Sequence, residues 1–383
     1  MIVGVPAEIA PGERRVALVP DAVKTLCGAG FQLVVEAGAG RAAGFDDSAY
    51  TAAGARIADR AGAFGADAVL KVQPPRELPS GGHEVDLLRS GAVLIAFLRP
   101  LDEPALAGRL AARGVTAFAL ELVPRITRAQ AMDALSSMSN LAGYRAVLLG
   151  ASALTKIFPM MVTAAGTIQP ARVFVIGAGV AGLQAIATAR RLGAIVEAYD
   201  TRPAVREQVE SLGARFVELE LETKDAQDAG GYARAQSEEF YAKQRRELGK
   251  RLAQTDVVIT TALVPGQRAP ILIDEAALRG MRKGAVIVDL AAEQGGNTEL
   301  CDPAQEVDAH GVRILPGRNL SSDVPTHASQ LYARNLVTLL RHLAPKGELA
   351  LDLEDEITRG TLLTHQGSIR NDRVKALVER AAS

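Results

Sequence analysis

The stretch ARVFVIGAGVAGLQAIATARRLGAIVEAYD, residues 171–200, contains the pattern that decides the fold. An apolar run at 171–177 leads into GAGVAG at 177–182, which is a GxGxxG sequence, and a helix-compatible segment follows. A second apolar run at 194–200 ends in an aspartate. A strand, a glycine-rich turn, a helix and an acid-terminated strand, in this order, predict a βαβ unit that binds a dinucleotide.

Each residue of this pattern has a physical role in such a site. Gly177 allows the tight turn, Gly179 lets a pyrophosphate approach the backbone, and Gly182 lets the helix pack closely on the strand. The helix N-terminus offers N–H groups to the phosphates. Asp200 can accept hydrogen bonds from both hydroxyls of an adenosine ribose and would repel a 2′-phosphate, which favours NAD(H) over NADP(H). Arg202 lies two positions later and weakens that preference, because NADP sites use an arginine there.

The same alternation of short apolar runs and amphipathic segments continues on both sides of this unit. Apolar runs lie before it at 2–5, 33–36, 68–72, 92–97 and 115–120, and after it at 215–219, 256–262, 284–291 and 311–316. Runs with little polar alternation are typical of parallel strands buried on both faces. We therefore expect an α/β chain with two Rossmann-like, doubly wound parallel sheets.

Long helical segments are expected to join the two domains. An Ala/Leu/Met-rich stretch follows a break at Pro124, and a second long helix is expected at 328–343. We predict a discontinuous first domain made of residues 1–135 plus 328–383. The second domain, residues 136–327, is predicted to bind the dinucleotide.

Composition excludes several classes of protein. The 383 residues include 43 Lys+Arg against 44 Asp+Glu, so a global basic field for nucleic acid is absent. Two cysteines form neither a disulfide framework nor a metal motif, which favours a reducing compartment and predicts no metal site. No segment has the length and apolarity of a membrane span, so contact with a membrane would need another chain. HExxH, GxSxG and P-loop sequences do not occur.

Two polar segments allow more than one interpretation. The first, at the predicted domain junction, could bind a phosphate, carboxamide or ribose, or could be a helix start capped by Thr127 with surface charges beyond it. Its polar residues are Arg125, Arg128, Gln130, Asp133 and Ser136. The second, 220–251, fits a solvated loop with a surface helix, or a lid. Met160-Met161 beside Phe158 is expected to fill a core.

Three segments carry a specific resemblance: PRITRAQAMDALSSMSNLAGYRAV (124–147), MMVTAAGTIQPARVFVIGAGVAGLQAIATARRLGA (160–194) and ITTALVPGQRAPILI (259–273). They resemble the NAD(H)-binding domain I of proton-translocating nicotinamide nucleotide transhydrogenase, in the bacterial form where this domain is a separate alpha subunit. The likeness covers nearly the whole chain. Alanine dehydrogenase shares the fold and the PGERRVALVP start, so the two must be distinguished.

Two positions depart from the alanine dehydrogenase pattern. That family holds pyruvate with an Arg and a Lys, which Arg15 and Lys71 match. Its catalytic His is replaced here by Arg99, and the Asp before its QGG sequence is replaced by Glu293.

The transhydrogenase resemblance implies a set of site residues. An Arg-Gln-Asp loop is matched by Arg125, Gln130 and Asp133. A Gly-Gly-Tyr in a mobile loop, about 220–235, is matched by Gly230, Gly231 and Tyr232. Gln130 would reach toward the partner's nucleotide, and Tyr232 would close over the bound one. The further nucleotide contacts implied by the family are Ile126, Thr127, Arg128, Ser136, Val180, Thr201, Gln244, Ala262 and Leu263.

The resemblance also implies a reaction and partners. NADH held here, in the cleft of the two domains, would pass hydride directly to NADP⁺ held by a partner subunit, coupled to proton translocation by membrane-spanning subunits. We expect a cytoplasmic homodimer that associates with the inner membrane only through these partners. The alternatives are a soluble alanine or related amino-acid dehydrogenase and a non-catalytic NAD(H) sensor.

Overall fold

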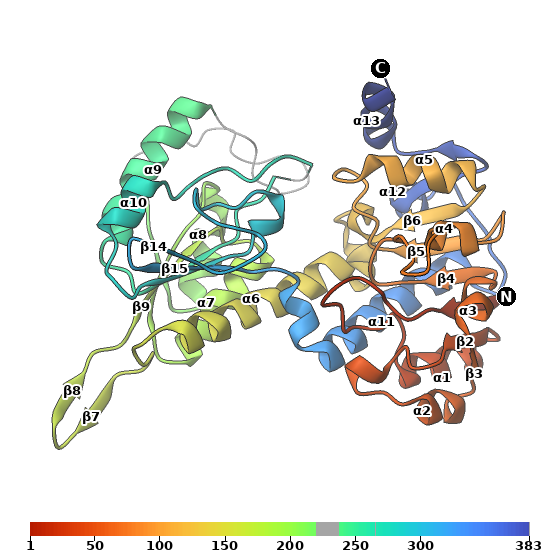
Figure 1. Ribbon diagram of the computed structural model, residues 1–383, viewed down its shortest axis with the longest axis horizontal. Helices are drawn as coiled ribbons and strands as arrows, with labels where there is room; N and C mark the ends of the chain where they lie inside the picture. The colour runs from red at the N-terminus through yellow and green to blue at the C-terminus, as the bar shows by residue number, and fades with distance from the viewer. Residues whose placement is uncertain (220–236, 265, 383) are drawn as a thin grey trace. The chain divides into compact units, whose positions relative to one another are not determined.

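A computed structural model describes residues 1–219, 237–264 and 266–382 of the chain. The chain divides into two compact units, described separately below (Figure 1). Unit 1 contains Met1–Met138 and Ser321–Ser383, and unit 2 contains Ser139–Leu320. Among the described residues, no helix combines the length and apolarity needed to cross a membrane.

Unit 1 is built on an eight-stranded sheet with the order β17-β16-β6-β5-β4-β1-β2-β3. Strands β1 to β6 are parallel, and the two strands from the C-terminal segment pair antiparallel at one edge. The strands are β1 (Ile2–Val5), β2 (Gln32–Glu36), β3 (Arg56–Ala58), β4 (Ala68–Leu70), β5 (Val93–Ala96), β6 (Thr116–Ala119), β16 (Leu362–His365) and β17 (Ser368–Ile369). The helices are α1 (Pro20–Gly28), α2 (Asp47–Ala52), α3 (Arg60–Phe64), α4 (Glu84–Leu87), α5 (Pro104–Ala112), α11 (Pro325–Leu343), α12 (Glu356–Thr361) and α13 (Asp372–Ala382).

Unit 2 is built on a seven-stranded sheet with the order β11-β10-β9-β12-β13-β15-β14, in which only the edge strand β14 is antiparallel among the described strands. The strands are β9 (Arg172–Ile176), β10 (Ile195–Tyr199), β11 (Arg215–Phe216), β12 (Val257–Thr260), β13 (Val286–Asp289), β14 (Val307–Ala309) and β15 (Val312–Pro316). The helices are α7 (Val180–Arg191), α8 (Arg206–Ser211), α9 (Glu238–Leu252) and α10 (Glu275–Gly280), and α6 (Ala134–Ala153) enters from unit 1. The parallel strands of both units follow the doubly wound order 3-2-1-4-5-6, which confirms the expected fold class.

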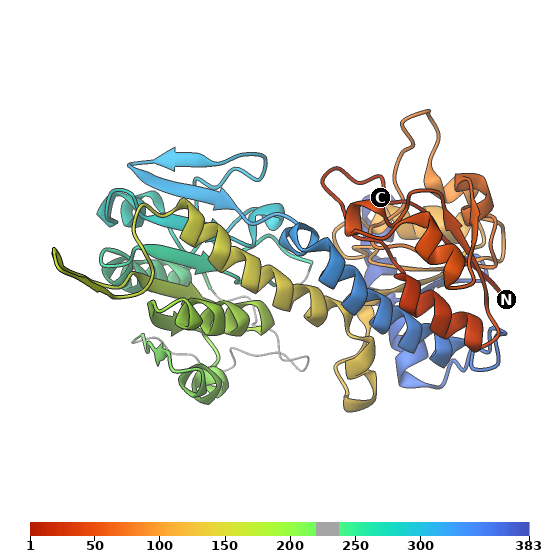
Figure 2. The same cartoon turned by 90° about the horizontal axis from the view of Figure 1, so that it is seen from below.

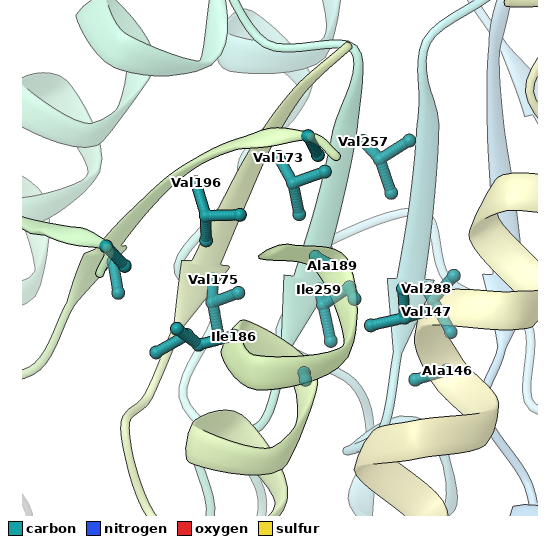
Figure 3. Packing of buried hydrophobic residues seen from close by; sticks show 14 of the residues in the cluster. Ala146, Val147, Val173, Val175, Ile186, Ala189, Val196, Val257, Ile259 and Val288 are labelled. Carbon is teal, nitrogen blue, oxygen red and sulfur yellow. The ribbon is translucent and has the colours of Figure 1, made fainter. Parts of the chain in front are cut away.

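The sheet of unit 2 is buried on both faces. On β9, Val173 and Val175 belong to one apolar cluster with residues of α6 and α7, while Phe174 and Ile176 belong to a second cluster that includes residues of α9 and α10. Figure 3 shows the first cluster, where the valines of the central strands meet α6 and α7. Because both faces exclude water, the four buried positions of β9, 173–176, are all apolar, and the exposed first residue is Arg172.

The second long helix does not carry the chain between units. Helix α11 begins at Pro325, three residues earlier than expected, and lies wholly in unit 1. The boundary before it falls at Leu320/Ser321, so the return to unit 1 is made by the short 3₁₀ helix Leu320–Asp323. The sequence suggested the helix because its leucines recur at helical spacing, and that pattern contains no information about which domain the helix covers.

A hairpin that the sequence did not indicate leaves unit 2 between α6 and β9. Among the described strands, β7 (Met161–Thr163) and β8 (Gly166–Ile168) pair only with each other, and Figure 2 shows them projecting from the unit. Met160 is 61% exposed and Met161 is 44% exposed, so the expectation that they fill a core is wrong. Only the neighbouring Phe158 is buried.

Glycines set the distance between α7 and its neighbours. A Cβ on Gly182 would lie 1.9 Å from the carbonyl oxygen of Gly177, which is well inside van der Waals contact. On the other side, a Cβ on Gly143 of α6 would lie 2.1 Å from the carbonyl oxygen of Ala181. Helix α7 is therefore close-packed against both the turn after β9 and helix α6, with no room for a methyl group.

We expect Gly182→Ala to lower the free energy of unfolding by about 3 kcal/mol, because the methyl group must push α7 away from the Gly177 turn. Urea unfolding followed by circular dichroism measures this change. The matched control is Gly179→Ala, where a Cβ would meet no atom within 4 Å, and we expect it to cost under about 1 kcal/mol. Equal destabilisation by both variants would contradict close packing at Gly182.

Candidate functional site

The GxGxxG turn and the acid predicted to face a ribose lie at one edge of the unit 2 sheet. Gly177 follows β9, Asp200 follows β10 and Thr261 follows β12, so all three stand at the carboxyl ends of neighbouring parallel strands. The chain runs from β9 outward through β10, then crosses to β12 on the other side. This reversal is the topological switch point, where open α/β sheets bind their ligands.

The glycine turn has the shape required for a phosphate site. Gly177 has φ +95°, and a Cβ there would lie 2.5 Å from Thr261 Oγ1. Gly179 is the N-cap of α7 and makes no side-chain cap, and space is open where its Cβ would be. The first N–H groups of α7 are therefore left without a capping side chain beside an open position, which suits an anion. These observations fit a pyrophosphate.

Asp200 is held rigidly at the end of β10. Its carboxylate accepts hydrogen bonds from the backbone N–H of Ala178 at 2.7 Å and of Arg202 at 2.9 Å. The guanidinium of Arg202 adds two more, Nε to Oδ1 at 2.9 Å and Nη2 to Oδ2 at 2.7 Å. The side chain of Asp200 is only 5% exposed. The acid is thus tied directly to the glycine turn, and Arg202 covers it.

Gln244 lies inside the protein and contacts Tyr199, the residue before this acid. It is 1% exposed, and its amide nitrogen donates to the hydroxyl of Tyr199 at 2.9 Å. Burial raises the pKa of the Tyr199 hydroxyl to about 12, with Asp200 contributing in the same direction, so the phenol stays protonated. The Gln244 Oε1 has no hydrogen-bond partner among the described residues. A buried acceptor of this kind suits a ligand donor, and the sequence suggested it only through the resemblance.

The segment after β12 is fixed by an asparagine that the sequence analysis missed. Asn297 accepts from the Ala262 N–H at 3.0 Å and donates to the Ala262 carbonyl at 2.9 Å. The N–H of Asn297 in turn donates to the buried Asp289, whose pKa is raised by burial. Leu263 follows with its side chain partly exposed. The available signal in the sequence was Asp289, an acid at the end of an apolar strand, which needs donors such as the N–H of Asn297.

The polar loop of the predicted domain junction belongs to unit 1. It forms a 3₁₀ helix, Thr127–Met132, on which Gln130 is exposed. Asp133 accepts from the backbone N–H of Ser136 at 2.8 Å and from its hydroxyl at 2.5 Å, so it caps the start of α6. Capping by Thr127 does not occur: the cap position of the 3₁₀ helix is Ile126 and makes no side-chain bond.

Two arginines of the loop, Arg125 and Arg128, have exposed side chains. Arg128 donates to the Asp355 carboxylate at 3.1 Å, and this carboxylate also contacts His342. The hydrogen bond of Asp355 with the Thr358 N–H, with help from these two side chains, holds the pKa of that carboxyl far below its ordinary value. The side chain of Arg125 is exposed. Gly231 and Tyr232, predicted for a mobile loop, lie outside the described residues.

The two positions that match a pyruvate site occur in a buried ionic cluster of unit 1. Lys71 is fully buried, and its ammonium lies 3.1 Å from Glu8 and 3.2 Å from Glu84. Arg15 forms a two-pronged pair with Glu13, at 2.6 Å and 2.7 Å. Glu8 and Lys71 follow β1 and β4, the switch point of this unit. Each cation therefore already has a carboxylate partner.

The positions that depart from the alanine dehydrogenase pattern differ in environment. Arg99 has φ +46°, and its N–H donates to Glu121 at 2.7 Å. Glu121 also accepts from Leu98 N–H at 3.1 Å, and burial raises the pKa of its carboxyl. Glu293, in unit 2, is exposed. Arg99 therefore does not supply the imidazole of the catalytic His, and Glu293 does not supply the shorter carboxylate of the Asp.

Acid should remove the stabilisation due to Glu13. Burial alone would raise the pKa of its carboxyl, but the hydrogen bonds and charge of Arg15, with Gln73, lower this pKa to about 2 from an ordinary 4.5. A lowered folded-state pKa means that the pair stabilises the fold above pH 4.5 and loses this effect as the pH falls toward 2. Between these values, the unfolding free energy of the wild type should fall relative to that of Glu13→Gln by roughly 3 kcal/mol.

Urea unfolding of both proteins between pH 2 and 6 measures this difference. Glu77→Gln is the matched control, because the Glu77 side chain is 74% exposed and faces Arg109 at 3.5 Å, and its difference from the wild type should stay small throughout. Parallel pH profiles for the wild type and Glu13→Gln would contradict the assigned role of the pair.

Comparisons with known proteins agree with this architecture. Residues 4–142 match the family described as "Alanine dehydrogenase/PNT, N-terminal domain", and residues 146–372 match "Alanine dehydrogenase/PNT, C-terminal domain". The chain is 50% identical over 374 residues to the first part of NAD(P) transhydrogenase subunit alpha of Rhodospirillum rubrum, covering 96% of this chain and 97% of that one. It is 32% identical over 384 residues to alanine dehydrogenase of Bacillus subtilis, covering 98% and 94%.

A solved structure supports the same relationship. The crystal structure of transhydrogenase from Sinorhizobium meliloti superposes with a TM-score of 0.86 at 46% identity, covering 96% of this chain and 100% of that one. The chain therefore belongs to the alanine dehydrogenase/PNT family and, within it, to the alpha subunits of NAD(P) transhydrogenases, which are oxidoreductases.

Proposed function

We propose that this chain binds NAD(H) at the carboxyl edge of the unit 2 sheet and passes hydride to or from NADP(H) held by a partner subunit. The observation that carries the proposal is the cradle formed by the Gly177–Gly182 turn, the uncapped start of α7, and the buried Asp200 carboxylate tied to that turn through Ala178. An open position for a diphosphate beside an acid for a ribose suits a dinucleotide without a 2′-phosphate.

In this proposal the chain performs no acid–base step of its own. Dihydronicotinamide supplies the hydride, and a protein contributes binding, orientation and exclusion of water. The N–H groups at the start of α7 would hold the diphosphate, and Asp200 would fix the adenosine ribose. Because the reaction depends on how two rings are positioned, small changes in orientation should affect the rate more than the affinity.

The loop of unit 1 is proposed to act at the nicotinamide end. Gln130 is exposed and has both a donor and an acceptor, so its amide can bond a carboxamide or a hydroxyl of a nucleotide. Asp133 caps α6 through Ser136, and we assign it the role of fixing the loop from which Arg125 and Gln130 project. Tyr232 is proposed to close over bound NAD(H). Ile126, Thr127, Arg128, Thr201, Ala262 and Leu263 are proposed as further contacts.

Partners belong to the proposal as well. The relatives are named as alpha subunits, and one of them as only the first part of an alpha subunit, which implies further chains. We propose that these chains hold NADP(H), span the membrane and couple hydride transfer to proton translocation. The present chain would then be cytoplasmic and associate with the inner membrane through them.

A second candidate function, oxidation of L-alanine, is favoured by one observation. Arg15 and Lys71 occupy the pyruvate-binding positions in a chain that is 32% identical to an alanine dehydrogenase. Against it stand Arg99 and Glu293 at the catalytic positions, with the surroundings described above. The two activities can be separated with the purified chain, because only the dehydrogenase would reduce NAD⁺ with L-alanine alone.

Reconstitution with the NADP(H)-binding soluble domain of a transhydrogenase tests the first proposal. The chain alone should bind NADH without transferring hydride, and the mixture should reduce an NADP⁺ analogue at the expense of NADH. Gln130→Asn should slow this transfer at least about tenfold while changing the NADH dissociation constant less than about twofold, because the shortened side chain misplaces the rings without removing the cradle.

Gln32→Asn is the matched control, since Gln32 is also an exposed glutamine of unit 1, and it should leave the rate unchanged. Absence of NADH-dependent turnover with the partner domain would refute the proposed function. Reduction of NAD⁺ by L-alanine would favour the second candidate instead. Equal losses of rate and NADH affinity in Gln130→Asn would show that Gln130 is only a binding contact.

We further propose that two copies associate through the β7–β8 hairpin. A two-stranded hairpin is at best marginally stable alone in water, yet this one pairs with no other described strand and exposes Met160, Met161, Val162 and Ile168. Several exposed apolar side chains on one projecting element are typical of a protein contact. Association of two copies would cover it.

The double variant Met161→Ser/Ile168→Ser should weaken self-association at least about tenfold, because it removes the apolar pair that faces across the hairpin. Sedimentation velocity over a range of concentrations measures this constant. Thr167→Ser, at the Val162–Thr167 pair, is the control and should leave the constant unchanged. A mass unaffected by the double variant would exclude the hairpin as the contact.

A further inference from the structure

The ribose-binding carboxylate of the proposed site is fully occupied by donors from the protein itself. Asp200 accepts four hydrogen bonds, two from the backbone N–H groups of Ala178 and Arg202 and two from the Arg202 guanidinium. An ionised carboxylate has about four lone-pair positions. With the side chain only 5% exposed, no acceptor capacity remains for a ribose diol.

We propose that Arg202 sets the nucleotide selectivity of this site by occupying the face of Asp200 that a ribose must take. The inference rests on the proposed binding of NAD(H) at the Gly177–Asp200 crossover. Arg202 is thereby a specificity-determining residue with two opposed effects. It competes with the adenosine ribose of NAD(H), and it offers a positive charge to a 2′-phosphate.

When NAD(H) binds, each ribose hydroxyl can replace one side-chain donor of Arg202 on the Asp200 carboxylate. Nε and Nη2 of Arg202 each donate to a different oxygen of Asp200, at 2.9 Å and 2.7 Å. The two hydroxyls of an adenosine ribose can replace these two donors, while both backbone N–H bonds stay in place. Binding of NAD(H) therefore breaks a charge-assisted pair and forms two hydroxyl–carboxylate bonds. Its net gain is smaller than that at an uncovered carboxylate.

The movement required is confined to the arginine side chain. Arg202 precedes Pro203 and has an extended backbone, φ −93° and ψ 110°, as the residue before a proline must. Its N–H bond to Asp200 is thus fixed by the chain, and only rotation about side-chain bonds can uncover the carboxylate. The Arg202 side chain is 14% exposed, so it borders solvent into which it can turn.

A 2′-phosphate reverses the sign of the effect. Asp200 repels this dianionic group, whereas the Arg202 guanidinium can pair with it through two N–H bonds. The Asp200–Arg202 pair therefore lowers the affinity for both nucleotides, but only in part. NAD(H) binds less tightly because Arg202 must first move off the carboxylate, and NADP(H) binds less tightly because Asp200 remains beside the 2′-phosphate.

Removing the guanidinium should therefore move the two affinities in opposite directions. We expect Arg202→Ala to tighten NADH binding about three- to tenfold, since a buried carboxylate deprived of its partner gains more from the ribose. The same variant should weaken NADPH binding about tenfold. Titration of each nucleotide, followed by its fluorescence and by calorimetry, gives the dissociation constants, and ADP-ribose with its 2′-phosphorylated form tests the adenosine end alone.

A double-mutant cycle locates the effect at the carboxylate. In an Asp200→Asn background, removing Arg202 should give no tightening of NADH binding, because no ion pair is left to displace. Arg202→Gln is a second variant that keeps a donor without the charge, for use if the alanine variant folds poorly. Arg215→Gln, which removes an exposed arginine paired with Glu197 at 3.4 Å, controls for the change in net charge.

The outcomes separate this inference from the proposed function. Unchanged NADH and NADPH constants in Arg202→Ala, with a wild type that binds NADH, would overturn only the role of Arg202. Parallel loss of both nucleotides would also overturn it, since Arg202 would then be an ordinary ligand contact. A wild-type chain that fails to bind NADH would overturn both proposals.

Discussion

The close approach of α7 to the turn after β9 is the constraint on which the proposed nucleotide cradle depends. The carbonyl oxygen of Gly177 lies only 1.9 Å from the position that a Cβ of residue 182 would take. This contact brings the first turn of α7 to the carboxyl end of β9, and the Ala178 N–H in the same turn holds Asp200 of the next strand. One packing distance therefore sets the position of the helix N-terminus, the phosphate opening and the acid together. Helix α6 supports this arrangement from the other side through Gly143.

Much of this arrangement could be predicted from the sequence because its causes are local. Strand positions that are buried on both faces are mostly apolar, so the runs at 173–176 and 257–259 are visible without any structure. The roles of Gly177 and Gly182 follow from the geometry of a tight turn. The acid at the end of β10 follows from the βαβ unit, in which the strand after the helix ends at the same edge of the sheet as the glycine turn.

Other features depend on contacts that the sequence does not record. The β7–β8 hairpin has three-residue strands without a buried face, so periodicity gave no sign of it, and Met160 looked like a core residue. The cap of α6 is Asp133, although Thr127 is also a residue type that caps helices. The pairing of Arg202 with Asp200 depends on a side-chain direction, which spacing alone leaves open.

The parallel strands follow the order 3-2-1-4-5-6 in both units, yet the loops at its reversal point are chemically unlike. One unit has a glycine turn and an open space there, whereas the other has the Lys71–Glu8 pair. The loops after the strands therefore carry chemistry that the sheets do not determine. A lineage with this doubled topology can change its substrate by exchanging a few loop residues in one copy, while the proposed cofactor site in the other copy and both folding cores are inherited intact.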